Sequence, residues 1–356
     1  MPVALPSLLS QISPAYDWLC QARNDWPDQS DVWDLRRSWS TERHRIEQQL
    51  ANGTYRFSLL TRITTKGGEV AHLWSARDAL VLKALSLALA RHLPASSRCT
   101  HLKGHGGLKG AVRSAAQVMM NHRFVFRTDV RSYYDNIDHG FLIERLKRHI
   151  ADERVLDPVR QYLNRTSEAG GIFYDFDKGI SRGCPLSPVI AAFFLHDLDQ
   201  RLEEQIQRSG IFYVRYMDDL LVLAPSRWTL RRAVKAINEE LSALNLEQHP
   251  DKTFIGYIAR GFDFLGYRFG LNGLVGLARQ TIVNFETKLS RLYEQLRRAN
   301  RECRQSFVMH ITTYINRFCG WATGGLNDEI GLDWKTGGHL PPGIGVFCLW
   351  RGRFHG

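Results

Sequence analysis

Three aspartates in the middle of the sequence have the surroundings that metal-assisted phosphoryl transfer requires. Asp218 and Asp219 are adjacent and separate two short apolar runs, a pattern typical of a hairpin with carboxylates at its tip. Asp129 directly follows a third β-type run, 123–128. Two divalent ions a few ångströms apart can lower the pKa of an attacking hydroxyl and hold a leaving phosphate, and Mg²⁺ prefers rigidly held carboxylate oxygens. The three aspartates therefore predict one metal site at the ends of neighbouring strands.

Helical patterns accompany these strands. The segment after Asp129 predicts a helix with Asp138 as its N-cap. A second helix is expected to begin with Ser187 as N-cap and Pro188 at the first helical position, and to continue through Leu202. The apolar face of the first helix contains four residues: Phe141, Leu142, Leu146 and Ile150.

The remaining periodicities extend this arrangement. The segment 75–91 is apolar nearly all round and predicts a buried helix, 230–244 predicts an amphipathic helix, and 262–267 is β-rich. The order β-α-α-β-β-α-β predicts an α+β fold in which an antiparallel sheet of the split βαβ kind carries helices on one face. After about Leu277, apolar residues repeat at spacings of three and four and predict a small helical module. Its exposed faces carry Lys288, Arg291, Arg297, Arg298, Arg301 and Arg304.

The charge balance indicates an anionic partner. Forty-seven lysines and arginines against 36 acidic residues give a net charge of +11, which favours nucleic acid. The loop 100–113 is rich in glycine and basic residues, so it could approach phosphates closely, although a flexible surface loop fits equally well. The basic helical module is likewise either a phosphate-tracking face or a solvated helix pair, and we favour the former.

Cysteine usage and hydropathy predict a cytoplasmic protein. The six cysteines form no CxxC pair, which is typical of a reduced chain. Cys99, His101 and His105 could bind a metal, but a polar loop is the favoured interpretation. No basic segment precedes an apolar run at the start, and the most apolar stretch, 79–90, contains Lys83 and is too short to span a bilayer. No membrane association is expected.

Several motifs in sequence order resemble those of reverse transcriptases. The YMDD of Tyr216 to Asp219 resembles the YxDD box, and DVRSYY from Asp129 resembles the first palm motif of that family. RGCPLSP, 182–188, resembles the QGxxxSP motif. The segments 249–253 and 261–267 are similar to the later palm motifs and primer grip of bacterial enzymes of the group II intron type, and 52–55 and 62–77 to the finger motifs.

This resemblance covers about 40–325 and implies a right-hand polymerase fold. The fingers and palm would occupy 41–277 and a small helical thumb 278–325. A helical extension, 1–40, would precede them and a tail, 326–356, would follow. The implied activity is RNA-directed DNA synthesis from dNTPs on an RNA template, with two Mg²⁺ ions, or Mn²⁺ in their place.

The resemblance also assigns residues to the chemistry. The metal site would include Asp129, Val130, Asp218 and Asp219. Lys252 would donate a proton to pyrophosphate, with a solvated turn lysine as the alternative. Tyr134 would act as a steric gate against the ribose 2′-hydroxyl, with a core aromatic as the alternative. The implied nucleotide-binding residues are Lys66, Arg77, Tyr134, Arg182, Gly183 and Tyr216.

Two positions depart from the family pattern. Arg182 stands where the family usually has Gln, and His72 where an Arg is common. The triphosphate clamp could therefore use Arg77, Lys103 or Lys109 instead. Nucleic acid is expected to contact Lys103, Lys109, Arg113, Phe264, Gly266, Arg297 and Arg298.

The sequence contains neither an HNH nor a Cys-rich pattern after the thumb-like helices, which argues against a splicing-and-homing role. From family analogy and size we expect a stand-alone bacterial enzyme that serves in antiphage defence with a cognate non-coding RNA. A homo-oligomer remains open. Three other classes also remain open: an RNA polymerase, a non-catalytic nucleic-acid-binding palm, and template-independent or protein-primed DNA synthesis. Tyr134 argues against the first, and the three aspartates argue against the second.

Overall fold

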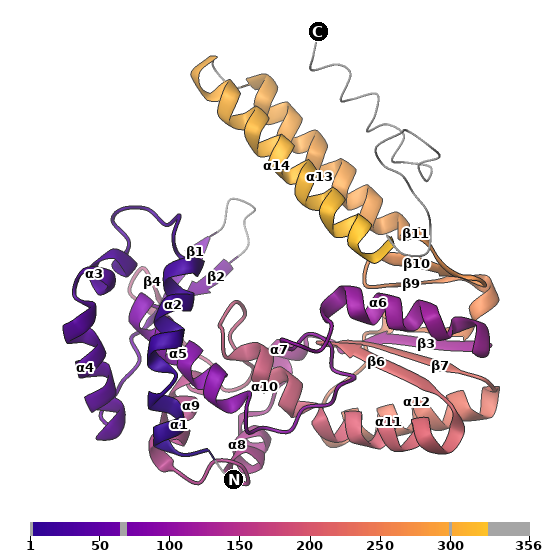
Figure 1. The fold of residues 1–356 in the computed structure, drawn as a ribbon, viewed down its shortest axis with the longest axis horizontal. Coiled ribbons are helices and arrows are strands. Elements are labelled where there is room, and N and C mark those ends of the chain that lie inside the picture. The colour runs from indigo at the N-terminus through magenta and orange to yellow at the C-terminus, as the bar shows by residue number, and fades with distance from the viewer. Residues whose placement is uncertain (1–2, 65–69, 299–300, 327–356) are drawn as a thin grey trace. The chain divides into compact units, whose positions relative to one another are not determined.

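The computed structural model describes residues 3–64, 70–298 and 301–326, and these form an α+β fold (Figure 1). The chain divides into two compact units. Unit 1 is built from 1–102, 130–201 and 236–249, and unit 2 from 103–129, 202–235 and 250–356. The predicted α+β class is confirmed. The predicted tail, 326–356, lies outside the described residues except for its first position.

Unit 1 is organised around one buried helix, α5 (Ala76–Leu89). Apolar residues occupy every face of α5, which explains why α1, α2, α3 and α10 can all pack against it. Ser75 caps this helix by accepting a hydrogen bond from the Asp78 backbone N–H. The surrounding helices are α1 (Leu5–Leu9), α2 (Ile12–Ala22), α3 (Asp31–Arg37), α4 (Trp39–Ala51), α7 (Tyr133–Asn136), α8 (His139–Lys147), α9 (Glu153–Leu163) and α10 (Ser187–Phe194).

Unit 1 also contains a four-stranded sheet in the order β2-β1-β4-β5. Its strands are β1 (Leu60–Thr64), β2 (Val70–Leu73), β4 (Thr166–Ala169) and β5 (Ile172–Asp175). The β1–β4 pair is parallel and the other two pairs are antiparallel. The antiparallel partners are near neighbours in sequence, whereas β1 and β4 come from distant parts of the chain.

Unit 2 contains the predicted antiparallel sheet, which we call the palm sheet. Its order is β6-β7-β3-β8, and every neighbouring pair is antiparallel. The strands are β3 (Phe124–Asp129), β6 (Phe212–Tyr216), β7 (Asp219–Ala224) and β8 (Phe254–Tyr257).

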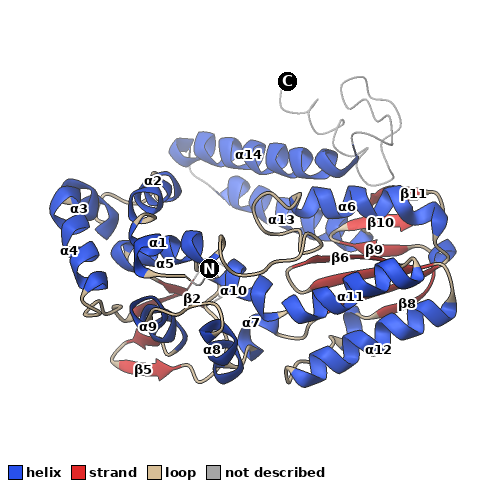
Figure 2. Ribbon diagram, turned by 60° about the horizontal axis from the view of Figure 1, so that its bottom comes forward, coloured by secondary structure: helices blue, strands red, loops and turns tan. Residues whose placement is uncertain are grey.

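Helices cover both faces of the palm sheet, so the prediction of helices on one face is wrong. The apolar side of α6 (Gly107–Val118) packs against one face, which includes Val125, Val214 and Leu221. The other face carries α11 (His196–Ser209) and α12 (Arg227–Ala243) (Figures 1 and 2). Consecutive residues of β6 and β7 are buried, so both faces of these strands are covered. A sheet that is buried on both faces needs a layer of helices on each.

A smaller sheet and a helix pair complete unit 2. The sheet has the order β11-β10-β9, with β9 (Phe262–Phe264), β10 (Tyr267–Gly270) and β11 (Gly273–Leu277). The predicted helical module is present as α13 (Arg279–Arg298) and α14 (Arg301–Leu326), which lie side by side (Figures 1 and 2). Their apolar residues form a separate core around Leu292, Leu296 and Ile311.

Two details of the predicted helices differ from the structure. Asp138 caps α8 as predicted, but Phe141 is 45% exposed. Ser187 is the first residue of α10 rather than its N-cap, because its hydroxyl hydrogen-bonds to the Tyr162 hydroxyl and the Ser181 carbonyl. Helix α10 then ends at Phe194 with Leu195 as its C-cap, α11 begins at His196, and the side chain of Leu195 stays buried. The apolar residues that predicted one continuous helix therefore belong to two consecutive helices, α10 and α11, and are buried in both.

Candidate active site

Strand register brings the three aspartates to one end of the palm sheet. Asp129 and Asp219 are paired directly across β3 and β7. Tyr216 pairs with Asp219 across β6 and β7, so Met217 and Asp218 form a two-residue turn between them. Directly paired residues on neighbouring strands lie close together. The hairpin with carboxylates at its tip is therefore confirmed, and the third carboxylate lies beside it.

Burial and the charges of neighbouring carboxylates raise the pKa of Asp218 and of Asp219. Burial, and then the charges of Asp129 and Asp218, raise the pKa of Asp219 to about 7. Burial, and then the charge of Asp129, raise the pKa of Asp218 to about 6. Lys252 opposes both shifts. A nearby divalent cation would stabilise all three carboxylates in the charged form.

Lys252 provides the nearest cation. Its ammonium donates a 2.8 Å hydrogen bond to Asp129 Oδ2, and this bond raises the pKa of Lys252. The lysine ends a 3₁₀ turn over Pro250–Lys252, shortly before β8. In the adjacent residues, the hydroxyls of Thr128 and Thr253 lie 2.7 Å apart and connect the same two segments. The predicted catalytic lysine therefore contacts the predicted metal site.

The three carboxylates are suitable ligands for a divalent ion, although they are not arranged around a single point as in a preformed metal site. In the part of the chain that the structure describes, no three His, Cys, Asp or Glu side chains are arranged to hold a metal. The three aspartates nevertheless offer only hard oxygen donors, which Mg²⁺ and Mn²⁺ prefer. The side chain of Val130 is fully buried and apolar, so this residue could contribute only its backbone carbonyl. An ion that takes Asp129 Oδ2 as a ligand would compete with Lys252 for that oxygen.

The predicted steric gate lies in unit 1 on the short helix α7. Tyr133 is buried and its hydroxyl donates a 2.6 Å hydrogen bond to the Ala191 carbonyl, whereas its neighbour Tyr134 is only partly buried. Tyr133, rather than Tyr134, is thus the aromatic that fills the core. Gly183 has a φ of 75°, and a Cβ placed there would meet nothing within 4 Å. Its backbone is accessible, as close approach of a nucleotide would require.

The charged residues predicted for the nucleotide have defined partners. Arg182 is exposed and donates a 2.6 Å hydrogen bond to Asp135. Arg77 donates to Gln49 at 2.7 Å and forms an ion pair with Glu42, so it connects α5 to α4. Lys66 lies outside the described residues. Tyr216, the last residue of β6, belongs to unit 2 and is partly buried.

At the sheet of unit 1, Arg62 and His72 of the finger-like segment 62–77 lie near Arg165, a residue that the sequence motifs do not identify. Arg62 and His72 are paired across β1 and β2. Burial, followed by the charges of Arg165 and Arg62, lowers the pKa of His72. Arg165 is itself buried and stacks on Phe176 at 4.3 Å. The register of the β1–β2 hairpin could have identified Arg62, but Arg165 carries no sequence signal that links it to the other two.

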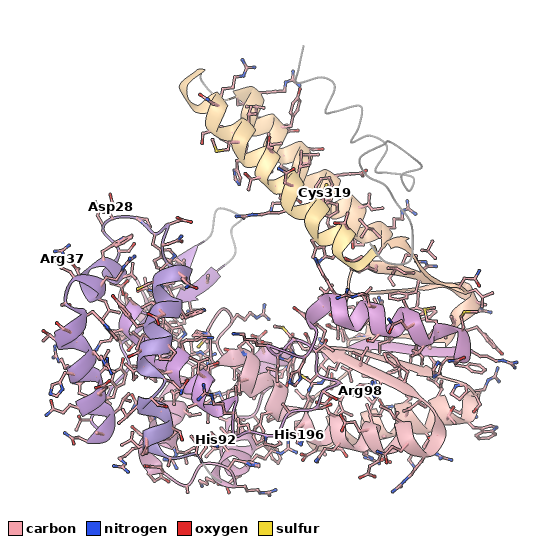
Figure 3. All side chains as sticks on the ribbon, in the orientation of Figure 1. Asp28, Arg37, His92, Arg98, His196 and Cys319 are labelled. Atoms are coloured by element: carbon pink, nitrogen blue, oxygen red, sulfur yellow. The ribbon has the colours of Figure 1, made fainter. Side chains whose placement is uncertain are left out.

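The residues predicted to bind nucleic acid fall into two groups in unit 2. Lys103, Arg113, Arg297 and Arg298 are exposed. Lys109 donates a hydrogen bond to the Gly320 carbonyl at 3.3 Å and so joins α6 to α14, the helix that carries Cys319 in Figure 3.

Phe264 and Gly266 have structural roles instead. Phe264 is 1% exposed and packs in the core of unit 2, so its side chain is not at the surface where it was expected to contact nucleic acid. Its alternation within β9 directs this side chain into the core. Gly266 has a φ of 83°, and a Cβ there would come within 2.9 Å of Trp321. It permits α14 to pack closely on the turn between β9 and β10.

Arg215 is another residue that the sequence predictions did not include. It lies in β6, just before the turn formed by Met217 and Asp218. Arg215 is fully buried, and its guanidinium donates a 2.8 Å hydrogen bond to the Met217 carbonyl. Met217 has a positive φ of 55°. A weak sequence signal existed, because an arginine within an otherwise apolar strand is rarely buried without a specific partner.

This combination of fold and site agrees with comparisons to known proteins. Residues 80–269, just over half of the 356-residue chain, match the reverse transcriptase (RNA-dependent DNA polymerase) family. The chain belongs to this family. The resemblance predicted from the YMDD and accompanying motifs is therefore confirmed, and with it the fingers and palm fold that the family shares.

Among curated proteins, the chain is similar to Protein YkfC of Escherichia coli, with 28% identity over 184 residues that cover 41% of this chain and 46% of that protein. It is also similar to an uncharacterized 91 kDa protein in the cob intron of Schizosaccharomyces pombe (28% over 169 residues, 45% of this chain and 20% of that protein). A third relative is a putative COX1/OXI3 intron 1 protein of Saccharomyces cerevisiae (20% over 292 residues, 65% and 35%). The matched regions span less than half the length of each relative.

Proposed function

We propose that the chain is an RNA-directed DNA polymerase that adds dNTPs to a primer 3′-hydroxyl with two Mg²⁺ ions, for which Mn²⁺ could substitute. The observation that carries this proposal is the convergence of Asp129, Asp218 and Asp219 at one end of the palm sheet. Family membership supplies the reaction class. The bounds of the fingers and palm, 41–277, and of the thumb, 278–325, are proposed on the same basis.

Each part of the site has a task in this proposal. The three aspartates hold the ions, with the Val130 carbonyl as a further donor. When bound, the ions would activate the 3′-hydroxyl and stabilise the pyrophosphate leaving group. Lys252 offsets the negative charge of the carboxylates through its 2.8 Å bond to Asp129, and it holds a proton within reach of the same centre. Because its side chain is 57% exposed, Lys252 can turn toward a phosphate without unfolding the adjacent strand.

Nucleotide and nucleic-acid contacts follow from the exposed cations. Tyr134 would exclude ribonucleotides, and Gly183 and Tyr216 would lie near the nucleotide. Arg62 and Arg165 supply positive charge at the four-stranded sheet of unit 1, whereas the lowered pKa of His72 favours its neutral form. We propose that Arg62, and Arg182 in the loop before α10, contact phosphates. Lys103, Arg113, Arg297 and Arg298 would follow the backbone of the template and product. Arg62→Ala would then raise the KM for dNTP, whereas Arg43→Ala, on the exposed face of α4, would not change it.

Primer extension tests the proposed reaction. The purified full-length chain is incubated with an RNA template, a DNA primer, Mg²⁺ and either dNTPs or rNTPs. Templated dNTP incorporation is expected, and the double variant Asp218→Asn, Asp219→Asn should abolish it. Glu204→Gln, an exposed carboxylate-to-amide change on α11, is the matched control and should retain activity. Incorporation that persists in the double variant would refute the catalytic assignment, and synthesis without template would favour the template-independent or protein-primed alternative.

We further propose a cytoplasmic role in bacterial antiphage defence with a cognate non-coding RNA as template. This role is supported by family resemblance alone. In the described residues, no helix has both the length and the apolarity needed to cross a membrane. The names of two relatives refer to introns, which makes intron RNA the competing partner. Sequencing the RNA and DNA that co-purify with the protein distinguishes the two partners. One recurrent RNA from outside introns would support the defence role, and intron RNA would support an intron-associated role.

A further inference from the structure

The most unusual charged residue outside the metal site is Arg215 in β6. It is fully buried, and it is the largest such side chain in the described part of the chain. A buried guanidinium is unfavourable unless hydrogen bonds compensate for its lost hydration. One of its bonds is directed at the catalytic turn, where Nη1 donates to the Met217 carbonyl at 2.8 Å. The location suggests a function for this unfavourably buried group.

The turn that Arg215 contacts is itself strained. Met217 and Asp218 are the two central residues between the paired Tyr216 and Asp219. Met217 has a φ of 55°, at the first central position, where glycine, asparagine or aspartate is usual in two-residue hairpins. A methionine side chain does not stabilise a positive φ, which is unfavourable for a residue with a Cβ. An interaction outside its side chain must therefore help to maintain the turn.

We propose that Arg215 is a positioning residue, which holds the Met217 peptide so that Asp218 and Asp219 face the metal site. The peptide unit is planar and rigid, so fixing the Met217 carbonyl also fixes the N–H of Asp218 and the direction of its Cα. A charge-assisted hydrogen bond is suited to this task because it is stronger than a neutral one. This proposal rests on the proposed polymerase function, since it concerns the same carboxylates.

The geometry also explains why arginine is used at this position. The donor lies two residues before the carbonyl that it contacts, and the side chain must follow the strand inside the core to reach it. A planar guanidinium can donate to the Met217 carbonyl and to further acceptors at once, whereas a lysine ammonium is shorter in reach and less constrained in direction. Lysine is therefore expected to replace arginine only in part.

Four variants test the assignment: Arg215→Met, Arg215→Lys, Arg215→Met with Met217→Gly, and Val214→Ala. Val214 precedes Arg215 in β6, is similarly buried and points to the opposite face of the sheet, so its truncation destabilises the same strand without affecting the turn. Three quantities are measured on each full-length variant: the thermal midpoint, the affinity for Mn²⁺ by electron paramagnetic resonance without nucleotide, and kcat and KM for dNTP.

Arg215→Met is expected to weaken Mn²⁺ binding and to lower kcat by roughly tenfold each, with little change in KM, because only the carboxylates are displaced. Arg215→Lys should retain an intermediate affinity, and Met217→Gly should restore part of it because glycine adopts positive φ without strain. Val214→Ala should lower the thermal midpoint and leave Mn²⁺ affinity unchanged at temperatures where it is folded. Arg215→Lys serves as the decisive variant where Arg215→Met fails to fold.

Equal Mn²⁺ affinity in the Arg215 variants and Val214→Ala, compared at the same folded fraction, would overturn the positioning role. A wild-type chain that binds no Mn²⁺ would overturn it as well. A wild-type chain that binds Mn²⁺ but extends no primer would instead refute the polymerase function, and the affinity series would still decide whether Arg215 shapes the site.

Discussion

Gly266 lies where β9 turns into β10, and the C-terminal part of α14 packs directly on it. Its φ is 83°, and a Cβ at this position would be 2.9 Å from Trp321 Cη2 and 3.2 Å from Thr281 Oγ1. Its carbonyl also accepts hydrogen bonds from the Ala278 N–H and the Thr281 hydroxyl at the start of α13. A methyl group at this position would therefore disturb both α13 and α14 where they meet the rest of unit 2.

The expected cost of Gly266→Ala has two parts. Alanine at positive φ costs about 1 kcal/mol relative to glycine. Trp321 cannot easily move, because its ring packs against Tyr267 at 5.1 Å and Phe318 at 5.8 Å. Overpacking of such a contact typically costs about 1–3 kcal/mol. The free energy of unfolding should therefore fall by about 2–4 kcal/mol, the sum of these two contributions.

Two other glycines of unit 2 separate these contributions. Gly210 has a φ of 61°, and a Cβ there would meet nothing within 4 Å, so Gly210→Ala should cost only the conformational part, about 1 kcal/mol. Gly276 has neither a positive φ nor a neighbour within 4 Å of a Cβ, so Gly276→Ala should leave stability unchanged or raise it slightly. Urea denaturation of the three variants measures each cost. If Gly266→Ala destabilises no more than Gly210→Ala, the Trp321 contact does not constrain this position.

Three further predictions concern other parts of the chain. Hydrogen bonds from Arg154 lower the pKa of Asp152 to about 2, so this carboxylate stabilises the fold above about pH 4, and its contribution is lost as the pH falls through about 4 toward 2. Asp152→Asn should therefore cost about 1 kcal/mol at pH 7, after allowance for solvent screening, and less in acid urea titrations; an equal cost at about pH 2.5 would contradict this. Tyr134→Ala should reduce the preference for dNTP over rNTP by roughly tenfold or more in single-nucleotide incorporation, and unchanged selectivity would exclude a steric gate. Mg²⁺ at about 100 times its Kd should raise the free energy of unfolding by about 2.7 kcal/mol, and calorimetry should show no such gain for the variant Asp218→Asn, Asp219→Asn.

The acidic half of the site could be predicted because strand register and turn geometry act over short sequence distances. Asp218 and Asp219 separate two apolar runs that can hardly pair in any other way than as a hairpin. Asp129 ends a strand of the same kind, and the direct pairing of Asp129 with Asp219 needed only one further assumption, that β3 and β7 are neighbours. The N-cap of α8 was predictable for the same reason, since Asp138 acts within one helical turn.

The structure adds what the sequence could not show where packing over long sequence distances decides the outcome. Phe264 lies in a segment that resembles a primer grip, which implies a nucleic-acid contact, but alternation in β9 points it into the core. Ser187 has the right type for an N-cap, yet its hydroxyl is used by Tyr162, 25 residues earlier. The glycine-rich basic segment 100–113 fitted a phosphate contact and a surface loop equally well, and the structure shows that the helix it leads into, α6, packs its apolar side on one face of the palm sheet. Local propensity cannot reveal such partners.

The two cations near the carboxylates, Lys252 and Arg215, are also hard to predict from the sequence. A carboxylate cluster is conspicuous in a sequence, because hard oxygen donors at a hairpin tip have few other uses, whereas each cation that balances it can come from anywhere within reach of a long side chain. Lys252 comes from the turn before β8 and Arg215 from inside β6. One contacts Asp129 directly, and the other contacts the backbone of the turn that carries Asp218. The Lys252 side chain is largely exposed and is free to move away from Asp129, whereas Arg215 is fully buried and remains with the fold. Lys252 thus acts on the charge of the carboxylates, whereas Arg215 acts on the backbone turn that carries them, and its contact does not depend on whether an ion is bound.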